Sequence, residues 1–160
     1  MSDDCGFVRG EYWFRCRAAA IIVENGSVLF AGNERVDYLY SIGGAIKLGE
    51  RAEDAVKREV YEETGVNYEI DRLAIIHENF FTEAQISLSV LQCHEIAFYF
   101  LMKQRGTQDL RSNSYTMGVR EIMHWVPVSD LDKYKAYPSF LKEYLKNPVE
   151  NLIHIITDDR

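Results

Sequence analysis

The stretch "GGAIKLGERAEDAVKREVYEETGV", from Gly43 to Val66, decides how the rest of the sequence is interpreted. Three glutamates, Glu59, Glu62 and Glu63, fall within little more than one helical turn and just before a glycine. Like charges three or four residues apart on an exposed helix repel each other by roughly 0.2–0.5 kcal/mol per pair. The cluster is therefore either an acidic surface helix without a function or the binding site of something positive.

A helix predicted over 52–64 places these carboxylates on the face that packs against the protein. At 3.6 residues per turn, Glu59, Glu62 and Glu63 continue the face that is apolar one and two turns earlier. Unpaired charge withdrawn from water is costly, and Arg58 could neutralise only Glu62, four residues further on. A bound divalent cation resolves the conflict, because Mg²⁺ prefers carboxylate and water oxygens and often bridges to substrate phosphate.

Residues before the predicted helix could complete this cation site. Glu50 precedes the helix and could reach back toward the carboxylates. Gly43 and Gly44 carry no side chain, so the bend that they form could offer a backbone carbonyl or amide to the same cation. For an isolated pair of glutamates a surface helix would be the better interpretation, but the whole arrangement favours a cation site.

The same residues match the pattern G-x5-E-x7-R-E-U-x-E-E-x-G-U, in which U is a bulky aliphatic residue. All nine defined positions match, at Gly44, Glu50, Arg58, Glu59, Val60, Glu62, Glu63, Gly65 and Val66. The stretch resembles the Nudix box, and the chain resembles the Nudix hydrolase superfamily. The resemblance implies an α+β fold, the Nudix α/β/α sandwich around a mixed β-sheet, as a single Nudix hydrolase domain over 1–160.

The resemblance also implies a metal-dependent hydrolase that uses Mg²⁺ or Mn²⁺. Such an enzyme cleaves the pyrophosphate linkage of a nucleoside diphosphate linked to another moiety. By their positions in the box, Glu59 and Glu63 would bind the metal, and Glu62 would pair with Arg58. These four residues are the implied catalytic set. Glu62 could also touch the metal.

The resemblance implies further metal contacts beyond these four residues. Glu50 would support the metal site, and Gly44 would give it a backbone carbonyl. The general base varies within the family, and Glu63 or Glu62 could serve here. Outside the box, Glu95 opens the strand "HEIAFYF" and is the candidate base and metal contact, with Glu121 in competition.

The substrate stays open at this stage. Nucleoside triphosphates, including oxidised or non-standard ones, and nucleotide sugars such as ADP-ribose are all compatible with the box. The S-Q-P-W-P-x-P-x-S motif of NADH-type members is absent. The alternative is a catalytically silent Nudix-like domain that binds a nucleotide as a regulator. Such a domain would be expected to have lost acids of the box, and this sequence has kept them.

Composition limits the other functional classes. The 160 residues are 47% hydrophobic, which suits one compact domain with a real core. With 18 basic and 25 acidic residues the net charge is −7, so nucleic-acid polymers and anionic membranes are not expected partners. We expect a small-molecule nucleotide as the partner, and the protein could form a homodimer.

The expected location follows from cysteine usage and from hydropathy. Three widely spaced cysteines without a C-x-x-C motif favour free thiols in a reducing compartment. The sequence shows neither an apolar signal-peptide region nor an apolar run of membrane-spanning length. We therefore expect a cytoplasmic protein.

The periodicity of the sequence indicates many strands and few helices. Strands are predicted over 15–23, 27–33, 37–42, 71–81, 94–103, 118–128 and 151–157, with helices over 52–64 and 138–147 and a helical turn over 129–134. Asn25 and Gly26 indicate a hairpin turn, and 82–93 could extend another hairpin. Arg15 and Arg17 alternate on one strand face, where they could meet substrate phosphate, although pairing with surface acids is the simpler expectation.

Overall fold

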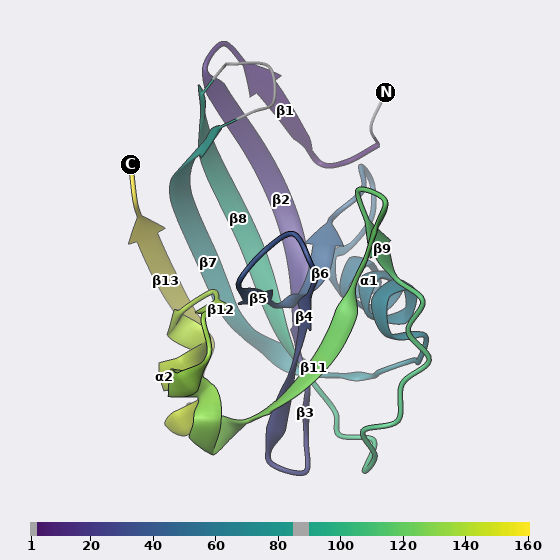
Figure 1. Ribbon diagram of the computed structural model, residues 1–160. Helices are drawn as coiled ribbons and strands as arrows, with labels where there is room; N and C mark the ends of the chain where they lie inside the picture. The colour runs from purple at the N-terminus through teal and green to yellow at the C-terminus, as the bar shows by residue number, and fades with distance from the viewer. Residues whose placement is uncertain (1–2, 85–89) are drawn as a thin grey trace.

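The computed structural model describes residues 3–84 and 90–160, and two mixed β-sheets with two α-helices form its framework (Figure 1). The helices are α1 (Ala52–Thr64), α2 (Phe140–Lys146) and the 3₁₀ helix η1 (Val128–Lys133). The strands are β1 (Gly6–Arg9), β2 (Tyr12–Ile21), β3 (Val23–Glu24), β4 (Ser27–Gly32), β5 (Leu39–Tyr40), β6 (Ile42–Ala45), β7 (Ile70–Ala84), β8 (Val90–Met102), β9 (Tyr115–Thr116), β10 (Val119–Arg120), β11 (Ile122–Pro127), β12 (Ala136–Tyr137) and β13 (Ile153–Asp158).

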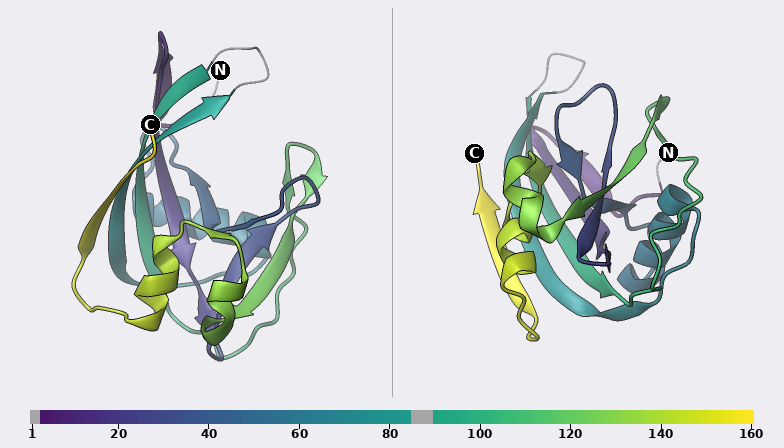
Figure 2. Two further views of the ribbon diagram at one scale, coloured as in Figure 1. Left: turned by 60° about the vertical axis from the view of Figure 1, so that its left-hand side comes forward. Right: turned by 60° about the horizontal axis from the view of Figure 1, so that its bottom comes forward.

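The larger sheet has the strand order β1-β2-β8-β7-β13, and β6 also pairs with β2. Strand β2 runs parallel to β8, and β13 runs parallel to β7, while the other pairs are antiparallel. The smaller sheet has the order β11-β4-β5-β12, with β3 on β4. In Figures 1 and 2, α1 and α2 lie on opposite sides of the molecule.

Two hydrophobic clusters form on the two faces of strand β2, because successive side chains of a strand point to opposite faces. Ala18 belongs to the cluster that contains Val56 of α1. The next residue, Ala19, belongs to the cluster that contains Leu141 of α2. The larger sheet therefore lies between two helical layers, and the expected α/β/α arrangement is confirmed.

The predicted helix of the box is confirmed over its full length. Helix α1 spans Ala52–Thr64, and Gly65 ends it in the left-handed conformation, with φ 73°. The Gly65 N–H donates to the carbonyl of Tyr61, as expected of a glycine C-cap. The predicted turn at Asn25 and Gly26 also lies between paired strands, β3 and β4.

The strands differ from the prediction in several places. The segment 37–42 divides into β5 and β6, which belong to different sheets, because Gly43 and Gly44 pair with β2. The segment 118–128 divides into β10 and β11, since β10 turns back onto β9. Strands β1, β9 and β12 are absent from the prediction, and the predicted strand over 15–23 divides into β2 and β3, which belong to different sheets. The extension of a hairpin over 82–93 is confirmed at both ends, whereas 85–89 lie outside the described residues. None of the described helices is long and apolar enough to cross a membrane.

Candidate active site

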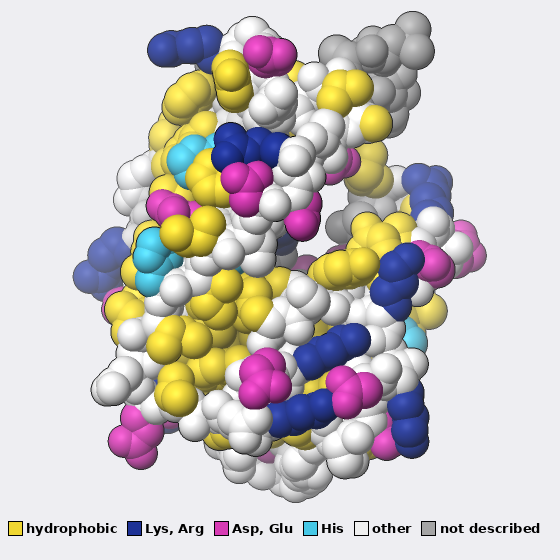
Figure 3. All heavy atoms as spheres, turned by 90° about the vertical axis from the view of Figure 1, so that its left-hand side faces the viewer, with side chains coloured by type: hydrophobic (Ala, Val, Ile, Leu, Met, Phe, Trp, Pro, Cys, Tyr) yellow, Lys and Arg dark blue, Asp and Glu magenta, His cyan; other side chains and the backbone are white. Residues whose placement is uncertain are grey.

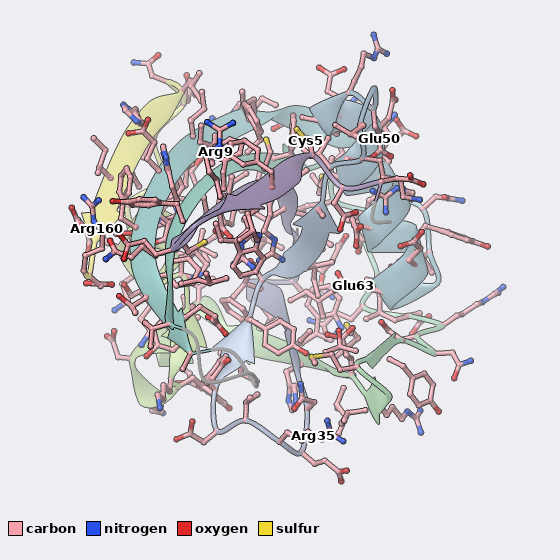
Figure 4. All side chains as sticks on the ribbon, turned by 90° about the horizontal axis from the view of Figure 1, so that it is seen from above. Cys5, Arg9, Arg35, Glu50, Glu63 and Arg160 are labelled. Atoms are coloured by element: carbon pink, nitrogen blue, oxygen red, sulfur yellow. The ribbon has the colours of Figure 1, made fainter. Side chains whose placement is uncertain are left out.

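A cluster of carboxylates forms where α1 packs against the glycine bend of β6. The Gly43 N–H donates to Glu63 Oε2 at 2.8 Å. A Cβ atom built on Gly44 would lie 2.5 Å from the Glu59 carboxylate, so only glycine allows this approach. In Figure 4, Glu63 lies on the inner side of α1, and Glu50 lies near the start of the helix. The box thus brings Glu59 and Glu63 to one backbone bend.

Glu121, between β10 and β11, brings a third carboxylate to the cluster. Its side chain accepts hydrogen bonds from Tyr40 Oη at 2.5 Å and from Ser114 Oγ at 2.7 Å. Glu63 is only 8% exposed, and burial, followed by the charges of Glu121 and Glu59, raises its pKa to about 9. Burial and these charges therefore favour the protonated form of Glu63 when no cation is present. From the sequence, Glu121 is expected only as a competitor of Glu95 for the role of general base.

Arg58 is held mainly by Glu50, and its predicted pair with Glu62 is present as a longer contact. Its Nε donates to Glu50 Oε1 at 2.8 Å, and its Nη2 donates to Glu50 Oε2 at 2.9 Å. Its Nη1 donates to Glu59 Oε1 at 2.5 Å, whereas the contact with Glu62 Oε2 is 3.4 Å long. The hydrogen bonds from Arg58 hold the pKa of Glu50 down at about 2. Glu50 precedes the helix, so its side chain can fold back alongside it, and it positions Arg58.

Apart from Glu50, these carboxylates line a cavity of about 620 Å³, which we call the carboxylate cavity. Its acidic lining residues are Asp4, Glu59, Glu62, Glu63 and Glu121, and its basic ones are Arg17, Lys47 and Arg58. Within residues 3–84 and 90–160, no group of three acidic, histidine or cysteine side chains is arranged to hold a metal ion.

The lining of the carboxylate cavity nevertheless has the right chemistry for a hard divalent cation. Carboxylate oxygens are the preferred ligands of Mg²⁺. Glu59 faces the side-chain-free Gly44 and is at present in contact with Arg58. Burial raises the pKa of Glu59, with Arg58 opposing that shift. The carboxylates of Glu59 and Glu63 are both removed from water and have few cationic partners. They could therefore bind a cation, which would replace part of the contact between Glu59 and Arg58.

Glu95 lines a second cavity and is not among the residues that line the carboxylate cavity. It stands opposite Arg15 in the parallel register of β2 and β8. Its Oε2 forms an ion pair with Arg15 Nε and lies 3.9 Å from Arg17 Nη1. The expected pairing of both arginines with an acid is therefore found, but the acid is buried.

The second cavity, of about 560 Å³, adjoins the carboxylate cavity at Arg17, which lines both. Arg17 Nη2 donates to the Gly43 carbonyl at 3.3 Å. We call this second cavity the aromatic cavity, because its walls include the rings of Tyr38, Phe81, Tyr137 and Phe140. The rings of Tyr38 and Tyr137 meet edge to face at 5.4 Å. Figure 3 shows the molecule hollowed on one face, with acidic and basic side chains close together beside the hollow.

Comparison with known proteins identifies the family. The model of the NUDIX domain matches residues 14–147. The chain belongs to the Nudix family. Its Nudix box is thus part of a match that covers most of the sequence. No curated protein matches this Nudix protein in sequence.

Solved structures resemble this Nudix protein at low sequence identity. The MutT protein from Bacillus halodurans has 17% identity and a TM-score of 0.67, covering 91% of each chain. The MutT protein from Methanosarcina mazei has 17% identity and a TM-score of 0.62, covering 86% of this chain and 94% of its own. An ADP-ribose pyrophosphatase from Streptococcus suis has 15% identity and a TM-score of 0.58, covering 89% of this chain and 98% of its own. At these identities the likeness shows the shared fold alone.

Proposed function

We propose that this Nudix protein is a metal-dependent pyrophosphohydrolase and that its residues form a single catalytic domain. It cleaves the pyrophosphate linkage of a nucleoside diphosphate joined to another moiety. The substrates are nucleoside triphosphates, including oxidised or non-standard ones, or nucleotide sugars such as ADP-ribose. The observation that carries the proposal is the gathering of Glu59, Glu63 and Glu121 in one cavity, with Glu63 buried among them.

The carboxylate cavity would hold Mg²⁺ or Mn²⁺. Glu59, Glu63 and Glu121 are its buried or half-buried acids, and the Gly44 backbone lies against Glu59. When bound there, such an ion supplies positive charge to the phosphates and acidifies water. Glu95 has no part in this set, because its carboxylate is engaged by Arg15 in the aromatic cavity.

The remaining residues of the box position the reacting groups. Glu50 holds Arg58 with both carboxylate oxygens, and Arg58 in turn holds Glu59 in place. Glu62 lines the cavity with its side chain 54% exposed and only a long contact to Arg58. We assign to the Glu62 carboxylate the role of accepting the proton of the attacking water.

The aromatic cavity would hold the nucleoside of the substrate. Aromatic walls with a few polar groups are typical of small-molecule sites. Arg17 lies at the junction of the two cavities, where a phosphate linked to that nucleoside would pass. A guanidinium is suited to such a phosphate because it offers several fixed donors.

A panel of nucleotides tests the proposal directly. Purified protein is incubated with nucleoside triphosphates, including oxidised ones, and with nucleotide sugars, in Mg²⁺, in Mn²⁺ and in EDTA. We expect hydrolysis of at least one compound with either metal, none in EDTA, and a rate about 10²–10⁴ lower in the Glu59→Gln variant. Nucleotide binding without turnover across the panel would instead indicate a silent binding domain.

A further inference from the structure

A row of polar side chains crosses the floor of the aromatic cavity. Thr157 of β13 is the register partner of Asn79 of β7, and Asn79 is the partner of Glu95 of β8. Glu95 is in turn the partner of Arg15 of β2. All four residues line the cavity. Four neighbouring strands therefore present four polar groups side by side beneath the aromatic walls.

The orientation of the Asn79 amide follows from its hydrogen-bond partners. Thr157 Oγ1 lies 2.7 Å from Asn79 Oδ1 and 2.8 Å from His77 Nε2. His77 is 3% exposed, and its Nδ1 has no hydrogen-bond partner among the described residues. A buried N–H without an acceptor is rarer than a buried acceptor without a donor, so we assign the proton to Nε2. Burial also lowers the pKa of His77, which keeps the ring neutral.

This tautomer sets the direction of the whole chain of hydrogen bonds. His77 Nε2–H donates to Thr157 Oγ1, and the Thr157 hydroxyl proton is then donated to Asn79 Oδ1. The amide cannot turn over without placing its NH₂ group against a hydroxyl that needs an acceptor. Asn79 therefore has its NH₂ group left as a donor for a ligand.

Glu95, on the neighbouring strand, supplies an acceptor beside that donor. It is 4% exposed, and both arginine contacts of its carboxylate are made to Oε2. Its other oxygen, Oε1, is the acceptor available to a ligand. The Arg15 guanidinium is held by this ion pair and by the rings of Trp13 and Phe81, at 4.6 and 5.3 Å. Donor and acceptor are thus set in a fixed order.

We propose that the aromatic cavity selects nucleobases with a keto edge, in which a carbonyl lies beside a ring N–H. Uracil, hypoxanthine and guanine have this edge, so the carbonyl accepts from Asn79 and the N–H donates to Glu95. Cytosine and adenine present an amino group beside a bare ring nitrogen. These bases set donor against donor and acceptor against acceptor, which leaves buried polar groups unpaired. The inference rests on the proposed function, because it places the substrate's nucleoside in this cavity.

Binding of uncleavable nucleotides tests the selection without requiring turnover. The probes are the α,β-imido triphosphates of uridine, cytidine, inosine and adenosine, measured by calorimetry with Mg²⁺. We expect uridine to bind about tenfold or more tightly than cytidine, and inosine likewise over adenosine. Equal or reversed affinities would overturn the inference. An absence of hydrolysis in the nucleotide panel would contradict the proposed enzyme activity and leave this binding measurement intact.

Two variants assign the selection to the Asn79 amide. Asn79→Asp exchanges the donor for an acceptor at the same size, and we expect the uridine-to-cytidine affinity ratio to fall at least about tenfold. Thr157→Val removes the hydroxyl that orients the amide, and the ratio should fall toward one. Asn67→Asp, on an exposed position after α1, is the matched control and should keep the wild-type ratio. A wild-type ratio in both cavity variants would show that Asn79 does not select the base.

Discussion

Both carboxylate oxygens of Glu50 accept hydrogen bonds from the Arg58 guanidinium, at 2.8 and 2.9 Å, whereas Glu62 Oε2 lies 3.4 Å from Arg58 Nη1. Two-point contacts between arginine and a carboxylate are among the stronger polar interactions. Glu50→Ala should therefore cost about 1–3 kcal/mol in the free energy of unfolding and lower kcat, because Arg58 no longer positions Glu59. Urea denaturation and steady-state rates measure the two effects.

Glu62→Ala is the control for stability. Its contact with Arg58 is longer and its side chain is half exposed, so the loss should stay below about 1 kcal/mol. An equal or larger loss of stability in Glu62→Ala than in Glu50→Ala would show that Glu62, and not Glu50, is the main partner of Arg58.

The pKa of Glu63, raised from 4.5 to about 9, makes the metal-free protein sensitive to pH. The folded protein binds this proton more tightly than the unfolded chain does. The resulting stabilisation is complete below pH 4.5 and is lost as the pH rises toward 9. In EDTA, the wild-type melting temperature should fall between pH 5 and pH 9, and that of Glu63→Gln should fall less. Parallel melting curves for the two proteins would contradict this account.

The same proton predicts the pH dependence of activity. A carboxylate must lose its proton to bind a cation, so Mg²⁺ must displace the proton of Glu63. Affinity for Mg²⁺ and the rate at limiting Mg²⁺ should both increase from pH 6 to pH 9. Titration of Mg²⁺ at several pH values measures this, and a maximum near pH 5 would refute it.

The two glycines of the bend should respond differently to substitution. In Gly44→Ala the heavy atoms nearest the new Cβ belong to the Glu59 carboxylate, at 2.5 Å, and this end of the side chain can move aside. In Gly43→Ala the new Cβ meets the backbone oxygen of Ala18 at 2.4 Å, and φ there is 152°. We expect Gly44→Ala to melt close to wild type with a rate reduced at least tenfold. Gly43→Ala should be destabilised by about 2 kcal/mol or more. Similar losses of stability in both variants would contradict the distinction.

Tyr40 should matter through its hydrogen bond to Glu121. Glu121 is 4% exposed, and Tyr40→Phe removes one of the donors to its carboxylate. We expect a loss of about 1–2 kcal/mol in unfolding free energy and a lower kcat. Tyr61→Phe, on the exposed side of α1, is the control and should change neither quantity. A Tyr40→Phe variant with wild-type kcat would show that this contact does not position Glu121.

Local rules were enough for the helix of the box and for the acids that it carries. Helical periodicity alone places Glu59 and Glu63 on one face, and a glycine after Thr64 ends the helix where predicted. The pattern of the box likewise predicted the family and its α/β/α fold. These features depend on residues close together in the chain, so the sequence determines them by itself.

Partners far apart in the chain were decided only by the tertiary structure. Glu95 was expected with the metal, but the register of β2 and β8 sets it opposite Arg15. Glu121 reaches the carboxylate cluster because Tyr40 and Ser114 hold it there from other segments. Strand register and the packing of loops join residues 80 positions apart in the Arg15–Glu95 pair and 81 apart in the Tyr40–Glu121 pair. No local periodicity encodes such pairings. The sequence therefore identified the acidic residues of the site, whereas the folded sheet determined which residues form hydrogen bonds and ion pairs with them.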